Sequence, residues 1–563
     1  MSGGAATHLI AAPIVLPLLS AALMLLGGAR WRLWKAALNL ASCAAGVGIA
    51  ATLLIASGGS GTSDAIGVYL PGNWPVPFGI VLVLDRLSAL MLVLTSCLGL
   101  AALLFALIRW QRAGVHFHAL FQLQLMGLNG AFLTGDLFNL FVFFEVMLVA
   151  SFGLLLHGSG ERRVQAGLHY VAVNLLASSL FLIGAAMLYG VTGTLNLADM
   201  ARRLAVIPVA DRGLLHAGVA VLGVAFVAKA AVWPLNFWLL PAYTGASPPA
   251  AAMFAVMTKV GFYAVLRVWS LFFPAGGGTT FLFGANALVW IGLATLAFGT
   301  LGVWGSQRLD RTVAYALIVS SGTLLAAAGF GIPALTGGAL YYLLGSTLAA
   351  SAFFLLVELL ERSRLGDHDP AFVEVPKERQ PFTEPTQTPL DANLDDEERA
   401  LIGRAVPGPL IFLSLSFAAC ALVIAGMPPF SGFLAKVAML TALLRVDGAT
   451  AATGTTGTID VPAWVLLALL IVSGLASLIA LLRLGIRYLW VPQAGPAPKL
   501  RLLECVPVAL LLTLCAGLLV GAGPVVRFTD AAARSLLQPD RYIDAVMSAR
   551  TVPSPPPTRT IAP

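Results

Sequence analysis

The sequence predicts an all-α protein that crosses a membrane about fourteen times, because apolar runs of spanning length recur along almost the whole chain. Of its 563 residues, 59% are hydrophobic and only 10% are charged, whereas roughly a quarter of the residues in a soluble protein are charged. The first run has no basic region before it, so we expect a retained span rather than a signal peptide.

The charge and cysteine patterns argue against several classes of function. The net charge of +7 comes from bases that cluster between apolar runs, which is typical of membrane topology rather than of nucleic-acid binding. Five cysteines lie in or beside apolar runs without a CxxC spacing, and no GxxxxGKS/T or GxGxxG nucleotide motif is present. We therefore expect no metal site, no cofactor and no nucleic-acid partner.

The apolar runs divide the chain into four regions. Residues 1–115 hold spans one to three, 116–272 a first repeat of spans four to eight, 281–490 a second repeat of spans nine to thirteen, and 491–563 span fourteen with the tail. The spans are expected at about 9–27, 36–56, 80–108, 116–134, 135–157, 165–190, 214–240, 248–271, 281–304, 312–331, 336–360, 408–444, 462–490 and 503–522.

Basic connections alternate with acidic or neutral ones, which predicts the orientation of the chain. By the positive-inside rule, both termini are expected outside and the long polar loop 361–405 in the cytoplasm. The arginines of connection 191–213 and of the tail are exceptions to this pattern. Loop 361–405 is rich in Glu, Asp, Pro and Arg, so we expect it to be mobile or ordered by a partner. The tail is expected to be amphipathic near 525–549.

One acid, Glu145, lies inside span five. At about 1.5 Å of rise per helical residue, it is roughly 13 Å from Asp136 and 18 Å from His157, which places its carboxyl near the midplane of a bilayer. A charge at that depth is costly unless a partner or a water-filled cavity is near. We therefore expect a cationic side chain to lie close to the Glu145 carboxylate.

Three of the six lysines, Lys229, Lys259 and Lys436, also lie inside apolar spans. Each costs about 2.5–3.5 kcal/mol at membrane depth, so an intramembrane lysine is a functional candidate by default. Desolvation also suits lysine to load and release a proton. Structural alternatives remain: Lys229 can form a buried ion pair with Glu145, while Lys259 and Lys436 can snorkel to an interface.

Other polar residues have simpler alternative roles. Asp136 can cap the next helix, and Arg267 near the end of span eight is expected to be an interface anchor. His169 in span six is expected to be an interface histidine rather than a proton carrier, and Asn174 lies in the same span. Hydroxyls in spans ten and eleven are expected to hold water between Lys259 and Lys436. They are Ser320, Ser321, Tyr341, Tyr342 and Ser346.

Prolines interrupt two spans that carry a lysine. Pro234 follows Lys229 in span seven, and Pro428 and Pro429 precede Lys436 in span twelve. Proline removes a backbone donor and breaks a helix locally. Paired broken helices in corresponding halves are typical of inverted-repeat transporters, so we expect spans four to eight and nine to thirteen to form two inverted five-helix repeats.

Three stretches of the sequence resemble one known family. They are LTGDLFNLFVFFEVMLVASFGLLLHG, KAAVWPLNFWLLPAYTGASPPAAAMFAVMTKVGFYAVLRV and AGMPPFSGFLAK. Together they resemble the antiporter-like subunits of respiratory complex I and of Mrp-type multisubunit cation/proton antiporters, over about residues 5–550. ASPP followed by MTKVG, and the tail AARSLLQPDRYIDAVMSAR, resemble the D subunits of the Mrp (Mnh/Pha) antiporters more than the complex I subunits.

The resemblance implies a proton path along the midplane, formed by Glu145, Lys229, Lys259 and Lys436. It also implies sibling membrane subunits as partners. The chain departs from the family pattern, because relatives often have histidine near Asn236 or Tyr243 and near Ser320, Ser321 and Gly345. We therefore expect the central path to rely on hydroxyls and water.

Three functional hypotheses follow. The first is a subunit of a monovalent cation (Na⁺ or K⁺)/proton antiporter in the inner membrane of a bacterium, and not an enzyme. The second is a proton-pumping subunit of a complex I or membrane-bound hydrogenase type redox complex. The third is a scaffold that has lost transport.

Overall fold

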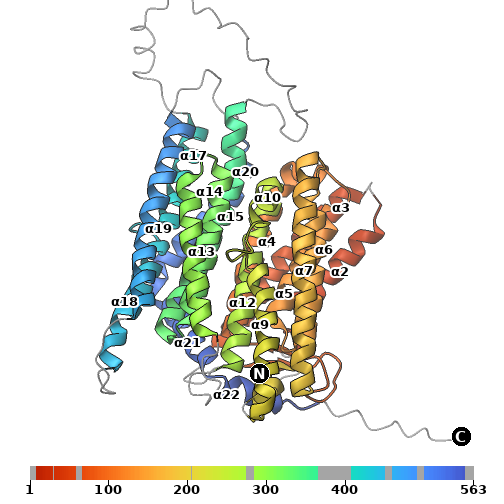
Figure 1. The fold of residues 1–563 in the computed structure, drawn as a ribbon. Coiled ribbons are helices and arrows are strands. Elements are labelled where there is room, and N and C mark those ends of the chain that lie inside the picture. The colour runs from red at the N-terminus through yellow and green to blue at the C-terminus, as the bar shows by residue number, and fades with distance from the viewer. Residues whose placement is uncertain are drawn as a thin grey trace, which may run out of the picture.

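The computed structural model describes residues 8–28, 31–58, 66–204, 206–273, 284–365, 407–450, 460–490 and 500–551. In these ranges the chain forms a bundle of long helices that run roughly side by side (Figure 1). Twelve helical stretches among the described residues are long and apolar enough to cross a membrane. The predicted multi-span helical fold is confirmed, whereas the count of fourteen spans, the four regions and the two inverted repeats stay predictions.

The helices fall into two groups along the chain. The first group is α2 (Ala12–Leu26), α3 (Arg32–Gly58), α4 (Arg86–Ile108), η2 (Trp110–Arg112), α5 (Phe117–Leu133), α6 (Leu137–Leu155), α7 (Glu161–Thr192), α8 (Leu197–Leu204), η3 (Val209–Asp211), α9 (Arg212–Lys229), α10 (Leu239–Gly245), α11 (Pro248–Phe254) and α12 (Met257–Phe272). The second group is α13 (Ala285–Gly305), α14 (Leu309–Gly329), α15 (Pro333–Leu365), α17 (Gly408–Ala425), α18 (Ser431–Thr450), α19 (Val461–Gly485), the π-helical η6 (Ile486–Trp490), α20 (Leu502–Val520), α21 (Ala522–Leu537) and α22 (Asp540–Met547).

Two short strands, which were not predicted from the sequence, precede α4. β1 (Gly67–Tyr69) pairs antiparallel with β2 (Leu82–Leu84), with Val68 opposite Val83. Span three was expected from residue 80, but α4 begins at Arg86. The reason is local: the Asp85 carboxylate accepts a hydrogen bond of 2.8 Å from the backbone N–H of Ser88, which is an N-cap, so the helix begins there.

The two predicted proline breaks are present. Helix α9 ends at Lys229 and α10 begins at Leu239, so Pro234 lies in a non-helical segment. The side chain of Trp238 donates to the carbonyl of Ala228 (3.1 Å), and Thr295 Oγ1 of α13 accepts the Trp233 N–H (3.0 Å). These bonds satisfy polar groups that the break releases. The second break separates α17 from α18 and contains Pro428 and Pro429.

Span eight, expected at about 248–271, is one apolar stretch but contains a turn that was not predicted. Helix α11 ends at Phe254 and α12 begins at Met257, with a turn at Ala255 and Val256 between them. No proline lies at this turn, so the sequence offers no local signal for it. The interruption lies only a few residues before Lys259.

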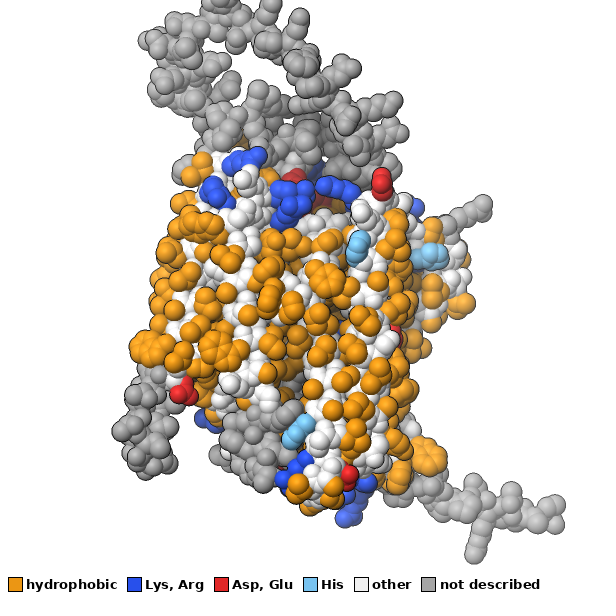
Figure 2. All heavy atoms as spheres, in the orientation of Figure 1, with side chains coloured by type: hydrophobic (Ala, Val, Ile, Leu, Met, Phe, Trp, Pro, Cys, Tyr) orange, Lys and Arg blue, Asp and Glu red, His pale blue; other side chains and the backbone are white. Residues whose placement is uncertain are grey.

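Helices α11, α12 and α15 form the centre of the bundle. The apolar stretch Pro248–Phe272 and that of α15 are entirely buried, whereas only 28% of the corresponding stretches of α3, α9 and α20 is buried. Hydrophobic side chains cover the broad side face of the molecule, and lysines and arginines gather at its two ends (Figure 2). This distribution fits a protein surrounded by lipid.

The tail folds back onto the bundle. Helices α21 and α22 lie at the end opposite to the C-terminus of α15 (Figure 1). Tyr542 and Val546 of α22 are buried, which confirms an amphipathic segment in this part of the chain. Residues 366–405 of the polar loop and the Pro-rich end from residue 552 lie outside the described residues.

Candidate functional site

Glu145, Lys229 and a serine from a third helix form one hydrogen-bonded group. Ser178 of α7 donates to Glu145 Oε1 of α6, and Lys229 Nζ donates to Ser178 Oγ at 3.2 Å. The predicted encounter of Glu145 with Lys229 therefore occurs through a hydroxyl. Ser178 was not predicted from the sequence, because one serine in an apolar helix carries no signal of its own.

The end of α9 also stabilises the Lys229 ammonium. Lys229 is the last residue of α9, where the carbonyl end of the helix dipole favours a cation. Its Nζ lies 5.1 Å from the centre of the Phe144 ring, in a cation–π contact. The side chain is 6% exposed, so these contacts replace water.

Lys259 is the central lysine and is fully buried, at 0% exposure. Its Nζ donates to Ser320 Oγ of α14 at 2.8 Å, and Ser320 Oγ lies 3.1 Å from Ser346 Oγ of α15. Ser320 and Ser346 thus join α12 to α14 and α15. That such hydroxyls hold water between Lys259 and Lys436 stays a prediction. Snorkelling of Lys259 to an interface is wrong, because its ammonium binds a hydroxyl inside the bundle.

The first two lysines are also linked by close backbone packing. A Cβ at Gly261 of α12 would lie 2.5 Å from the backbone N of Ala230 and 2.8 Å from the backbone C of Lys229. Only a glycine fits at this distance. The backbone of α12, two residues beyond Lys259, therefore packs directly against the end of α9.

Lys436 is held by backbone carbonyls rather than by an acid. Its Nζ donates to the carbonyl of Ala425, the last residue of α17, at 2.9 Å, and to that of Leu470 of α19 at 3.4 Å. Gly474 gives it room, since a Cβ there would lie 2.9 Å from Lys436 Nζ. Lys436 therefore points into the break between α17 and α18.

A partly polar strip lies between the central serines and Lys436. A Cβ at Gly345, next to Ser346, would lie 3.0 Å from Ser431 Oγ at the start of α18. Ser431, Ser321 and Thr258 each have a buried hydroxyl without a hydrogen-bond partner among the described residues. Buried polar groups are normally satisfied by protein or water, so these hydroxyls indicate a region suited to water.

Three of the other predicted residues lie outside the line formed by Glu145 and the three buried lysines. Asp136 caps α6 through the N–H of Asn139 (2.8 Å), and burial raises the pKa of its carboxyl despite that bond. His169 is exposed and bonds the carbonyl of Gln165 in its own helix. Asn174 is buried but donates to the carbonyl of Tyr170, also in α7.

The two tyrosines of span eleven have different surroundings. Tyr341 donates to the carbonyl of Leu518 on α20 (2.8 Å), so its hydroxyl faces away from Lys259, contrary to the expectation. Tyr342 is buried, and its hydroxyl interacts with the side chains of Ser320 and Thr323 on α14. Tyr342 therefore belongs to the cluster of hydroxyl-bearing side chains around Lys259, and Tyr341 does not.

Two buried ion clusters were not predicted. Arg267 pairs with Asp85 at 2.6 Å, so its expected role as an interface anchor is wrong. At the far end of α15, Arg362 pairs with Glu504 of α20, and Trp110 donates to Glu358 at 2.8 Å. Their partners are distant in sequence, so no local pattern reveals them.

No group of three or more His, Cys, Asp or Glu residues in the described ranges has the arrangement of a metal site. The fold and the line of buried lysines instead define a multi-pass membrane protein with a polar axis between its helices.

Residues 134–371 match the family described as NADH:quinone oxidoreductase/Mrp antiporter, TM. The chain is 49% identical over 543 residues to the D subunit of a probable K⁺/H⁺ antiporter of Rhizobium meliloti (strain 1021), covering 96% of this chain and 98% of the relative. It is 32% identical to the D subunit of the Na⁺/H⁺ antiporter of Bacillus subtilis (strain 168), covering 95% and 98%.

A chain in the structure of the Mrp complex from Dietzia sp. DQ12-45-1b superposes with a TM-score of 0.77 at 27% identity, covering 96% of this chain and 99% of that one. A chain of respiratory complex I from Thermus thermophilus shares the fold, with a TM-score of 0.70 at 21% identity over 96% of this chain and all of that one. This chain belongs to the family of antiporter D subunits, as its sequence motifs suggested.

Proposed function

We propose that this chain is the D subunit of a multisubunit monovalent cation/proton antiporter and that protons cross it along the buried lysines. The relatives named as antiporter D subunits cover nearly the whole chain at up to 49% identity. A relative named as the N subunit of NADH-quinone oxidoreductase, from Desulforudis audaxviator (strain MP104C), reaches 30% over 74% of the chain. The higher identity and coverage of the antiporter D subunits favour antiport over a redox-driven pump.

The observation that carries the proton path is the alternation of lysines and hydroxyls across the middle of the bundle. Lys229 donates to Ser178, and Ser178 donates to Glu145. If the ammonium passes a proton to Ser178 Oγ while the serine passes its own proton to the carboxylate, one proton moves from Lys229 to Glu145. The serine is unchanged after this step.

The same logic extends through the centre. Lys259 donates to Ser320, and Ser320 contacts Ser346. Water between the unpartnered hydroxyls of Ser321 and Ser431 would complete the path to Lys436. A charge arriving on one lysine lowers the proton affinity of the next, which moves the proton along the line. The cation crosses in exchange, within the complex of sibling membrane subunits.

The proposed orientation places both termini outside and loop 361–405 in the cytoplasm of a bacterial inner membrane. On the sequence alone, the arginines of connection 191–213 are an exception to the positive-inside rule. In the structure, Arg202 and Arg203 both pair with the buried carboxylate of Asp199 at 2.9 Å. Because the positive-inside rule counts lysines and arginines whether or not they are paired, this connection remains an exception to the proposed orientation.

The test is the Na⁺- or K⁺-triggered pH change in everted vesicles that contain the complete gene cluster. Wild type should respond, and Lys259→Ala should lose the response while the complex still assembles. Tyr341→Phe is the control, because that hydroxyl bonds Leu518 outside the line. A full response of Lys259→Ala would favour the scaffold hypothesis, and no response of wild type to either cation would contradict antiport.

A further inference from the structure

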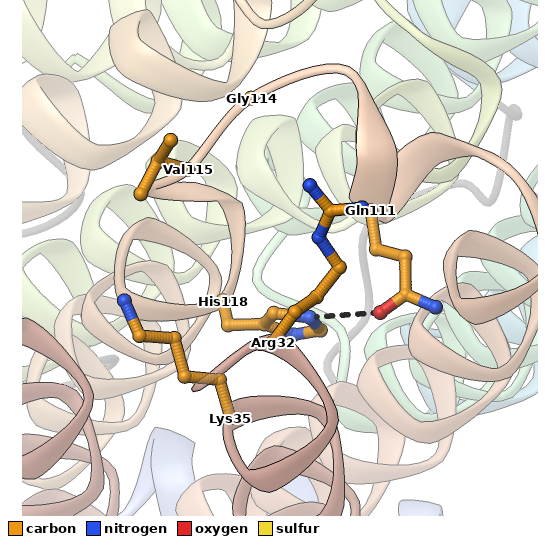
Figure 3. Close-up of a pocket in the computed structure, with 6 residues that line it drawn as sticks. All are labelled: Arg32, Lys35, Gln111, Gly114, Val115 and His118. Atoms are coloured by element: carbon orange, nitrogen blue, oxygen red, sulfur yellow. Dashed lines mark hydrogen bonds between the residues drawn. The ribbon is translucent and has the colours of Figure 1, made fainter. Parts of the chain in front are cut away.

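A small pocket opens between α3, η2 and α5, far in sequence from the line of lysines. It is lined by Arg32, Lys35, Gln111, Gly114, Val115 and His118 (Figure 3). We call it the α3–α5 pocket. None of its lining residues is acidic, so its charge is positive.

A chain of buried hydrogen bonds fixes the floor of the α3–α5 pocket. Gln122 donates to Asn39 Oδ1 (2.7 Å), and Asn39 Nδ2 lies 2.9 Å from His118 Nδ1. Nδ1 therefore accepts, and Nε2 of His118 carries the proton that it donates to Gln111 Oε1 (3.2 Å). His118 is thus a neutral part of a rigid wall, and the cations of the pocket are Arg32 and Lys35.

Lys35 is buried without a counter-charge. Its side chain is 5% exposed, and its stem packs against Gly27, where a Cβ would lie 3.3 Å from Lys35 Cε. Neither Lys35 nor Arg32 forms an ion pair with a carboxylate among the described residues. Burial of an ammonium without a counter-charge is costly. An anion at the pocket would supply this counter-charge.

Exposed apolar side chains neighbour the two cations along the chain. Trp31, Leu33 and Trp34 at the start of α3 are exposed, as is Val115, which lines the pocket. The rings of Trp31 and Trp34 meet edge to face, 5.9 Å apart. Tryptophans beside basic residues are typical of the level at which lipid headgroups lie. Beyond them α3 continues as one of the most lipid-exposed helices.

We propose that the α3–α5 pocket binds the phosphate of an anionic phospholipid, with Arg32 and Lys35 as its cationic ligands. The acyl chains lie along the exposed apolar face of α3. The bound lipid supplies the anion that Lys35 lacks. This site is independent of the proton path, since none of its residues belongs to that line.

The test is native mass spectrometry of the delipidated complex after addition of phosphatidylglycerol. Wild type should hold one phosphatidylglycerol that Arg32→Gln/Lys35→Gln loses, with retention falling about fivefold for each charge removed. The control, Arg162→Gln/Arg487→Gln, removes two exposed arginines on α7 and η6 and should retain the lipid. Equal retention by the two double variants, whether both keep or both lose the lipid, would overturn the proposal.

Two further arms identify the ligand and guard against misfolding. Val115→Glu places an acid at the exposed rim without changing a buried residue, and it should also weaken retention of phosphatidylglycerol. Zwitterionic phosphatidylcholine should not be held by wild type. If inorganic phosphate at millimolar concentration displaces the phosphatidylglycerol, or if Val115→Glu binds as wild type does, the assignment to a lipid is wrong.

Discussion

The two proline-broken spans of this chain hold their lysines in different ways. In the first, Lys229 ends a helix and reaches Glu145 through Ser178. In the second, Lys436 lies beyond the break, and among the described residues its ammonium donates to carbonyls alone, those of Ala425 and Leu470. A similar break thus serves one lysine with a carboxylate partner and another with neutral acceptors. The first site therefore supplies an opposite charge near its lysine, which the second does not.

Removal of the Glu145 carboxylate should reduce antiport more than any other change. A small loss would contradict the difference between the two lysine sites. Glu145→Gln keeps an acceptor for Ser178 but removes the charge that distinguishes the first site. Antiport in everted vesicles should fall about a hundredfold, the scale of a lost proton-transfer group. Glu161→Gln, at the exposed start of α7, is the control and should leave the rate unchanged. Full activity of Glu145→Gln would show that the two sites work alike.

The bridging hydroxyl should give the next largest effect. Ser178→Ala separates Glu145 from Lys229, and antiport should fall about tenfold, since a hydrogen bond to a charged group contributes roughly 1.5–3 kcal/mol. The neighbouring Ser179 is exposed and donates to the carbonyl of Leu175 in its own helix. Ser179→Ala should therefore behave as wild type, and an equal loss in both variants would refute a specific bridge.

Crowding of Lys436 tests the second site. Gly474→Ala would place a Cβ 2.9 Å from Lys436 Nζ and 2.8 Å from the carbonyl of Ala425. We expect a loss of roughly fivefold in antiport, because overpacking costs about 1–3 kcal/mol and the flexible lysine can shift. Gly517→Ala, where no atom lies within 4 Å of the new Cβ, is the control. A normal rate for Gly474→Ala would mean that these carbonyls do not hold the lysine during transport.

Asp136 should give the smallest effect, on stability alone. Burial raises the pKa of its carboxyl above the ordinary value of 3.8. The protonated form therefore stabilises the fold below pH 3.8, and this contribution is lost as pH rises through the folded pKa. Asp136→Asn caps α6 without a charge. The pH dependence of the free energy of unfolding should therefore flatten by less than about 1 kcal/mol, which the melting temperature at several pH values measures. An unchanged pH profile would contradict this.

The sequence predicted what depends on hydropathy and local breaks. Long apolar runs predicted the spans, and three lysines at membrane depth were conspicuous because each is costly there. It could not predict Ser178 or the pairing of Arg267 with Asp85, since both depend on how distant helices align. The break before Lys259 was also hidden, because no proline or glycine lies at the turn. Packing rather than local chemistry decides these features.

The proposed proton path joins the two lysine sites through Lys259 and Ser320, and substitutions of Ser320 test it most directly. Ser320→Val and Ser320→Thr add side chains of equal shape, but only threonine keeps the hydroxyl that Lys259 binds. In everted vesicles with the assembled complex, we predict that Ser320→Val loses at least about tenfold in cation-triggered proton movement. Ser320→Thr should retain most of it. Equal rates for the two variants would contradict a proton path that passes from Lys259 through this hydroxyl.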